Sequence, residues 1–266
     1  MSKQLKQEMG EYLWGDGTLY IGLMAAFEGE EYVYHLSGCQ GADGKLWRNP
    51  EEARAATTSY KHGVSRDMLA GFLLGTFGPA KFPGAVAHLC NYVRRVGRLS
   101  TNPDSRSDLR IGGWVALANA CKHHHLSVWK NLGWRGVLAY SLFGWTEGLV
   151  DLLSSCTPQR GYQRHLVLVS LLTRKKQQRV SLFDRWTLSI VDYCLPNNPI
   201  VWYLQGDLER MEEEYPHHVN RAQNYAYEPL VYPWAEENFR LAQVHMGEWP
   251  VRLLKAMIDD LRGERG

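Results

Sequence analysis

The sequence lacks the motifs of the most familiar nucleotide-processing and ester-processing folds. It has no G-x-x-x-x-G-K-[ST] phosphate loop, no G-x-G-x-x-G after a strand and no G-x-S-x-G nucleophile elbow. These absences disfavour nucleotide hydrolysis of the common type and α/β-hydrolase chemistry. There is also no H-E-x-x-H, and the consecutive histidines 123–125 point in different directions on a helix, which suits one metal ion poorly. We therefore expect neither a metal nor a cofactor.

Cysteine pairs and long apolar runs are lacking as well. The five cysteines are scattered, odd in number and without a C-x-x-C motif. This pattern argues for a reducing compartment at synthesis rather than a disulfide framework. The N-terminus lacks the apolar core of a signal peptide. The most hydrophobic long stretch, Val137–Leu153, contains Glu147 and Asp151 and is too polar to span a bilayer. We expect a protein that is made in the cytoplasm and not inserted into a membrane.

The chain also has little net charge. Its 30 basic and 28 acidic residues leave a formal net charge of +2. That balance gives no general drive towards nucleic acid or an anionic membrane. One local basic run, Arg174 to Arg179, follows an apolar run. We interpret it as a solvated helix end, because cations are favoured at the C-terminal end of the helix dipole.

Helical periodicity is what the sequence has in abundance. The 266 residues are 45% hydrophobic and 22% charged, which is typical of a globular protein and indicates a single domain over 1–266. Leu138, Leu142, Trp145, Leu149 and Leu152 are spaced 4, 3, 4 and 3, which predicts one apolar stripe. Further helices are predicted after Ser65 and at about 18–28, 84–98, 112–125, 161–175, 183–194, 198–214, 234–246 and 250–262.

Proline and glycine breakers separate the predicted helices. The resulting order of helix, short loop and helix is typical of stacked antiparallel α-hairpins, so the predicted fold class is all-α. Residues 32–36 are a candidate short strand, and 166–169 suit a buried helix better than a strand. A long polar loop is predicted at about 37–56, and long ordered loops are often functional.

The most unusual stretch is the helix entry from Thr57 to Asp67. Ser65 is well suited to be an N-cap, and Asp67 then lies in the first turn, where the helix dipole favours a carboxylate. Local helix physics accounts for both residues without a function. It does not account for Tyr60, His62 and Arg66 beside them. These form a workable acid–base set at a helix N-terminus, which presents free N–H groups to ligands.

Two aromatic segments carry further candidates. In the polar loop, Trp47 is suited to stack on a sugar or a base, and Arg48 to clamp a carboxylate or phosphate. The alternative is a loop pinned by a buried tryptophan and a surface salt bridge. Near a second helix start, Trp202, Tyr203 and Asp207 are candidates for a substrate-binding tryptophan and tyrosine and a catalytic aspartate. A helix whose aromatic residues pack in the core is the favoured explanation for Tyr203 and Asp207.

Two carboxylates lie inside the most apolar predicted helix. Glu147 and Asp151 are four residues apart on or near its stripe, where a carboxylate is costly unless it is paired. Either another residue pairs with them, or Glu147 is a catalytic group that faces an interior cleft.

The successive α-hairpins, the aromatic richness and the polar clusters at helix starts resemble an (α/α) toroid. That barrel is shared by many glycoside hydrolases and polysaccharide lyases, and the length of this chain suits a partial or compact version. The Ser65-Arg66-Asp67-Met68 entry and the Asp43–Pro50 loop also resemble uncharacterised proteins of tailed bacteriophages. The toroid resemblance implies a ligand site at one end of the barrel, where helix N-termini and long loops meet.

This resemblance predicts a carbohydrate-active or carbohydrate-binding helical protein, associated with a virion. The competing hypothesis is a non-enzymatic structural or adaptor protein of a larger assembly, and a third is an intracellular regulator of a host protein. The expected partners are a polysaccharide or assembly proteins, and not nucleic acid. The implied roles are Asp67 as acid or base, His62 or Tyr60 as proton-transfer partner, Arg66 and Arg48 as substrate clamps, and Trp47 and Trp202 as stacking platforms.

Overall fold

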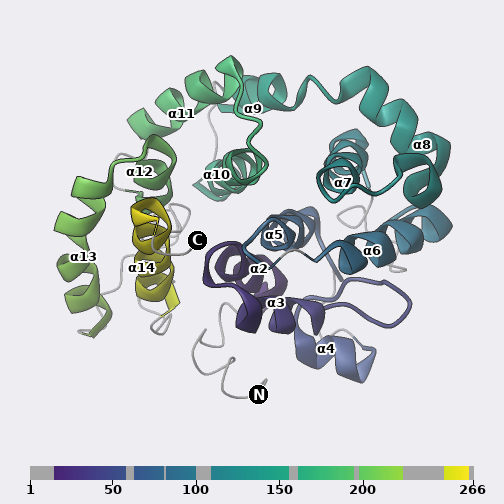
Figure 1. The fold of residues 1–266 in the computed structure, drawn as a ribbon, viewed down its shortest axis with the longest axis horizontal. Helices are drawn as coiled ribbons and strands as arrows, with labels where there is room; N and C mark the ends of the chain where they lie inside the picture. Colours follow the sequence, from purple (N-terminus) through teal and green to yellow (C-terminus); the bar gives the residue numbers. More distant parts are fainter. Residues whose placement is uncertain are drawn as a thin grey trace. The chain divides into compact units, whose positions relative to one another are not determined.

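The structure is a computed structural model, and its architecture is helical. It describes residues 15–57, 63–80, 82–99, 109–155, 161–194, 198–223 and 249–263. These ranges contain helices and no β-strand, and Gln40 and Leu46 form an isolated bridge. The predicted all-α fold class is therefore confirmed (Figure 1). None of the helices in these ranges is long and apolar enough to cross a membrane.

Two compact units make up the described chain, one from Gly15 to Glu147 and the other from Gly148 onward. The helices of the first unit are α2 (Gly17–Glu28), α3 (Glu30–Ser37), α4 (Pro50–Ala55), α5 (Arg66–Thr76), α6 (Pro83–Val96), α7 (Ile111–His123) and α8 (Val128–Phe143).

The core of the first unit forms where α2 and α5 lie side by side (Figure 1). A Cβ atom added to Gly22 would lie 1.9 Å from the carbonyl oxygen of Gly71, and one added to Gly71 would lie 2.4 Å from Cα of Leu19. The two backbones therefore touch. Just beyond α5, a Cβ atom added to Gly78 would lie 2.1 Å from the carbonyl oxygen of Ala25. Higher residue numbers in the first segment contact higher residue numbers in the second, so α2 and α5 run parallel, with their N-termini at the same end.

Helices α6, α7 and α8 pack against one another in the remainder of this unit. The sulfur atoms of Cys90 on α6 and Cys121 on α7 lie 3.5 Å apart, and both side chains are buried. Helix α8 is interrupted at Gly133, whose φ of 67° lies in the left-handed region. The turn of α8 before Gly133 and the longer part after it therefore differ in direction.

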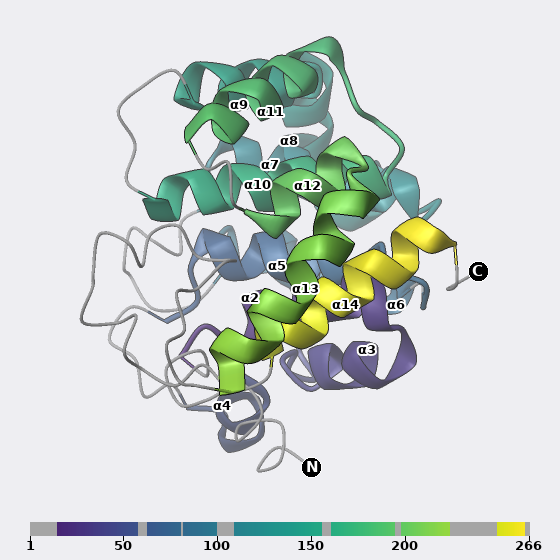
Figure 2. The same cartoon turned by 90° about the vertical axis from the view of Figure 1, so that its left-hand side faces the viewer.

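The second unit contains α9 (Glu147–Ser155), whose first residue still belongs to the first unit, and α10 (Gly161–Lys176), α11 (Leu182–Cys194), α12 (Pro199–Gln205), α13 (Leu208–Gln223) and α14 (Trp249–Arg262). Helices α13 and α14 lie side by side (Figure 2), and Arg262 pairs with Glu212 at 2.7 Å. The Tyr203 hydroxyl of α12 donates to Asp260 of α14 at 2.6 Å. Polar contacts thus join these three helices.

The strand considered at residues 32–36 is wrong, because the segment is part of α3. Its buried side chains are Tyr32, Val33, His35 and Leu36, which is the spacing of one helix face rather than an alternation. The acidic pair Glu30 and Glu31 opens the helix, where the dipole favours negative charge.

The single apolar stripe predicted over Leu138–Leu152 is also wrong, because two helices cover it. Helix α8 ends at Phe143, and the backbone N–H of Gly144 donates to Tyr140 as a C-cap. The Thr146 hydroxyl then donates to the Phe143 carbonyl before α9 begins. The helix predicted over 198–214 is likewise divided, by Gly206, into α12 and α13. Residues 166–169 are helical, as favoured, and the helix predicted at 234–246 lies outside the described residues.

Candidate functional site

The loop between α3 and α4 is held by its own backbone. Gly41 donates to the Lys45 carbonyl at 2.8 Å, and Trp47 donates to the Cys39 carbonyl at 2.9 Å. The Trp47 side chain is only 7% exposed, and the ammonium group of Lys45 lies 3.6 Å from the centroid of its ring. Packing and a cation–π contact therefore account for Trp47 here.

Arg48, at the end of this loop, is buried and joins two helix starts. Its guanidinium donates to the carbonyl oxygen of Gly15 at 2.5 Å and to that of Gly63 at 2.6 Å. A third donor forms a hydrogen-bonded ion pair with the carboxylate of Asp16. Arg48 therefore ties the residue before α2 to the segment that precedes α5.

Asp16 is the N-cap residue of α2, but its side chain makes no capping hydrogen bond. Burial raises the pKa of the Asp16 carboxyl to about 6, and the charge of nearby Asp67 acts in the same direction while Arg48 opposes both. The side chain nevertheless remains 31% exposed. Asp16 is thus a carboxyl group that can hold a proton near neutral pH and still reach solvent.

Asp67 lies in the first turn of α5 and is buried. Ser65 occupies the N-cap position, as predicted, but its hydroxyl donates to the Asp67 carboxylate instead of capping the backbone. The serine therefore orients a carboxylate. Arg66 is exposed at the first position of α5, while Tyr60 and His62 lie outside the described residues.

We call Asp16, Arg48, Ser65 and Asp67 the Arg48 cluster. It lies where the N-termini of the parallel helices α2 and α5 meet, so Asp67 and Arg48, both sequence candidates, are brought together. The two carboxyl groups differ in surroundings, since one has a raised pKa and the other is held by a serine hydroxyl. A carboxyl group with a pKa of about 6 beside a second carboxyl group is suited to acid–base chemistry.

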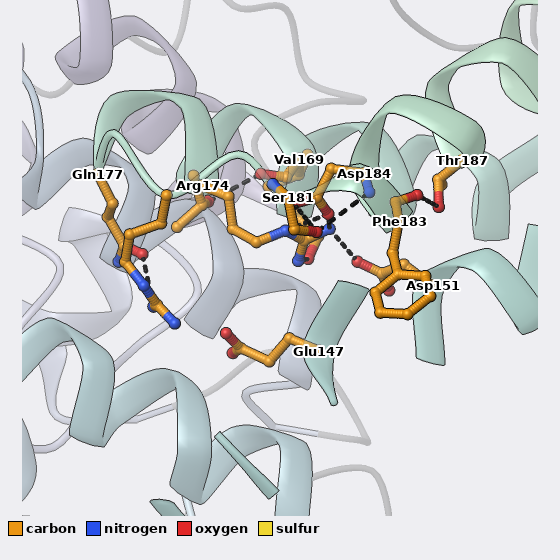
Figure 3. Close-up of polar contacts among 12 residues, drawn as sticks. Glu147, Asp151, Val169, Arg174, Gln177, Ser181, Phe183, Asp184 and Thr187 are labelled. Carbon is orange, nitrogen blue, oxygen red and sulfur yellow. Dashed lines mark hydrogen bonds and ion pairs between the residues drawn. The ribbon is translucent and has the colours of Figure 1, made fainter. Parts of the chain in front are cut away.

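A second cluster lies in the second unit and contains Asp151, Arg174, Ser181 and Asp184, which Figure 3 labels, together with Ser170. The Arg174 guanidinium contacts Asp151 and Asp184 at 2.7 Å each and Ser170 at 2.7 Å. Arg174 is 5% exposed, so the interpretation of the run from Arg174 to Arg179 as a solvated helix end is wrong at its first residue. We call this group the Arg174 cluster.

Two residues of the Arg174 cluster, Ser181 and Asp184, also cap the N-terminus of α11. Asp184 accepts hydrogen bonds from the backbone and the hydroxyl of Ser181 at 2.7 Å, and its own N–H donates to the Ser181 hydroxyl at 3.3 Å. This reciprocal arrangement is a capping box built with aspartate. Burial raises the pKa of Asp151, although Arg174 opposes that shift. The cluster therefore has a structural explanation in every contact.

The remaining sequence candidates are spread over both units. Glu147, in the first unit, accepts a hydrogen bond from Asn119 at 2.8 Å. In the second unit, Asp207 precedes α13 and accepts from the backbone of Arg210 at 3.2 Å, as an N-cap does. Trp202 and Tyr203 are buried in α12. Core packing, the explanation favoured for Tyr203, accounts for both side chains, and Trp202, predicted as a stacking platform, is 1% exposed.

No family model, curated protein or solved structure matches this chain. The chemistry of the two clusters is therefore the only basis for assigning a function. Across the described ranges, no group of three or more His, Cys, Asp or Glu side chains is arranged to hold a metal ion.

Sequence reasoning missed Asp16 and the pairing of Arg174. A signal for Asp16 was present, because Gly15-Asp16-Gly17 directly precedes an apolar helical run, which is the usual setting of an N-cap. No comparable signal marks Arg174. The adjacent Lys175 and Lys176 have the same charge, and they donate to the Tyr203 carbonyl and the Asp260 carboxylate.

Proposed function

We propose that the chain is a carbohydrate-active protein whose ligand binds and reacts at the Arg48 cluster. The observation that carries the proposal is the pair Asp16 and Asp67 at two adjacent helix N-termini, with the pKa of Asp16 raised to about 6. Hydrolysis of a glycosidic bond uses one carboxylic acid to protonate the leaving group and one carboxylate as base or nucleophile. The Arg48 cluster supplies two neighbouring carboxyl groups, and the pKa of one of them, Asp16, is raised to about 6.

The roles follow from the contacts. Asp16 is assigned as the general acid, because its raised pKa keeps it protonated at mildly acidic pH. Asp67 is assigned as the carboxylate partner, oriented by Ser65. Arg48 is a positioning residue, since its hydrogen bonds fix Asp16 against two backbone carbonyl groups. Arg66, exposed at the start of α5, is suited to clamp a substrate.

The fold that we propose for this function is a compact (α/α) toroid-like barrel. The parallel pair of α2 and α5 supports it, because in a succession of α-hairpins the helices of one layer all run in the same direction. Such an arrangement gathers helix N-termini at one end. Association with a bacteriophage virion is part of the same proposal and rests on the sequence resemblance alone.

The test is a screen of polysaccharides for binding and for release of reducing sugar, with the wild type, Asp16→Asn and Asp67→Asn. We expect each variant to stay folded and to lose at least about a hundredfold in rate, since general acid–base catalysis contributes that much. The wild-type rate should fall as pH rises through about 6, where Asp16 loses its proton. Asp192→Asn, in the second unit, is the matched control and should keep full activity.

The proposal is overturned if the wild type neither binds nor cleaves any polysaccharide in the panel. It is also overturned if both carboxyl variants retain wild-type binding and rate.

A second candidate function, a structural or adaptor protein, is favoured by the surface of α11. Leu182, Trp186 and Tyr193 are exposed along this helix, which is more apolar surface than a monomer usually leaves on one helix. This candidate predicts a stable oligomer or complex that Trp186→Ser disrupts. Light scattering that finds only a monomer, unchanged by the substitution, would count against self-assembly through α11.

A further inference from the structure

Helix α8 leaves a row of large apolar side chains on the surface of the first unit. Trp134, Leu138 and Leu142 are spaced by four residues and are 61%, 49% and 52% exposed. Trp145, just after the helix, is 70% exposed. Soluble monomers rarely leave such an apolar face uncovered. We call these four residues the α8 face.

The opposite side of α8 is already used for packing. Its buried residues are Leu132, Gly136 and Ala139, and the helix packs on α7 and α6. Small side chains on the inner side let α8 approach those helices closely, while the large side chains point away. The exposure of the α8 face is thus built into the helix and is not a consequence of loose packing.

The charged side chains on the helices that form and support this face are all basic, although Glu147 follows Trp145 and accepts a hydrogen bond from Asn119 of α7. Helices α6, α7 and α8 contain no Asp or Glu, and their Lys and Arg residues are Arg94, Arg95, Lys122, Lys130 and Arg135. Arg94 and Arg95 donate to the backbone carbonyl oxygens of Lys130 and Asp43, which are neutral acceptors. The chain as a whole has a net charge of only +2, but α6, α7 and α8 form a cationic region. A partner that binds the α8 face must therefore be anionic as well as apolar.

We propose that the α8 face docks on an anionic lipid surface. Tryptophan suits the headgroup boundary because it joins an apolar ring to a polar N–H, and leucines enter the acyl region while lysine and arginine meet the headgroups. A second copy packed face to face would bring like charges together. Nucleic acid would use the tryptophans for stacking but has no use for Leu138 and Leu142.

The test is co-sedimentation of the full chain with vesicles of equal parts phosphatidylcholine and phosphatidylglycerol, against vesicles of phosphatidylcholine alone. We expect binding to the anionic vesicles only, weakened by salt and accompanied by a blue shift of tryptophan emission. The substitutions Lys130→Gln and Arg135→Gln should each weaken binding about fivefold. Combining Trp134→Ser, Leu138→Ser and Leu142→Ser should weaken it at least about tenfold.

The matched control is Val150→Ser with Leu153→Ser, which removes exposed apolar side chains from α9 and should leave vesicle binding unchanged. Folding of every variant is checked by its helical circular dichroism and thermal unfolding. The proposal is overturned if the wild-type protein does not bind anionic vesicles. This holds equally if the protein instead binds a single-stranded oligonucleotide, an acidic protein or a second copy of itself. Equal binding by the α8 triple variant also overturns it.

Discussion

Each of the two units contains a buried arginine that is paired with aspartate. The two arrangements differ in how fully the carboxyl groups beside the arginine are bonded and buried. Arg174 meets two carboxylates and a serine hydroxyl, and Asp184 is occupied further as part of a helix cap. The described contacts of Arg48 include the Asp16 carboxylate and the backbone carbonyl groups of Gly15 and Gly63. Burial raises the pKa of an aspartate in both clusters, but Asp151 is enclosed beside Arg174 and Asp184, whereas Asp16 has a pKa of about 6 and a side chain that is 31% exposed.

The difference shows how burial and ion pairing decide whether an aspartate has a structural role or can exchange a proton. A charge that is fully paired stabilises one geometry and resists any change of protonation. A carboxyl group that is desolvated but singly paired is poised to exchange a proton. Asp16, rather than either partner of Arg174, is accordingly the group that we assign to catalysis.

The sharpest way to break this comparison is to remove each arginine. Arg174→Met leaves Asp151 and Asp184 without their cation, and we expect the free energy of unfolding at pH 7 to fall by about 3–5 kcal/mol. Arg48→Met should cost less, about 1–3 kcal/mol, because Asp16 can take up a proton when its partner is lost. Denaturant unfolding measures both values.

Arg179→Met supplies the control for this pair, since Arg179 is exposed in the same basic run and should change stability by less than about 0.5 kcal/mol. An Arg48 variant less stable than the Arg174 variant would contradict the ranking.

The pH dependence of stability sharpens the comparison at Asp16. Its pKa is raised from 3.8 to about 6 on folding, so its contribution to stability is fully present below pH 3.8 and is lost as the pH rises through about 6. Asp16→Asn should remove this dependence, flattening the change between pH 4 and 7 by about 1–2 kcal/mol after allowance for partial exposure. Unfolding in denaturant across that pH range tests it.

Asp43→Asn, an exposed aspartate of the same unit, should follow the wild-type curve. If Asp16→Asn follows it too, the raised pKa has no energetic consequence and the assignment of Asp16 as the acid loses its support.

The smallest expected effect separates two serines, each of which bonds a nearby aspartate. Ser181→Ala removes a true helix cap and should cost about 1 kcal/mol of unfolding free energy. Ser65→Ala removes a hydroxyl that orients Asp67 without capping the helix, and should cost less than about 0.5 kcal/mol while lowering activity. Equal losses of stability would show that Ser65 acts as an ordinary cap.

Short-range patterns predicted part of this molecule well. The helical fold class follows from apolar periodicity, and Asp67 was singled out because helix N-termini have rules that depend on a few neighbouring residues. The same rules did not reveal Asp16 as its partner, because Arg48, which holds Asp16, is 32 residues away along the chain. Contacts at that separation depend on how helices pack, which one sequence does not state.

Periodicity also failed where it was continuous across a break. The regular spacing from Leu138 to Leu152 passes over Gly144 and Thr146, whose hydrogen bonds end one helix before the next begins. In the basic run, Arg174 and the two lysines that follow project about 100° apart around a helix, so composition could not reveal that Arg174 faces inward.

The contact between Gly22 and Gly71 has a consequence for how firmly the two carboxylates are spaced. Packed side chains can change rotamer and let helices slide, whereas two bare backbones in contact have no such freedom. Asp16 is the N-cap residue of one of these helices and Asp67 lies in the first turn of the other, so the contact between the glycines fixes the position of one carboxyl group relative to the other. An alanine at either glycine would therefore alter the spacing of two acids that it never touches.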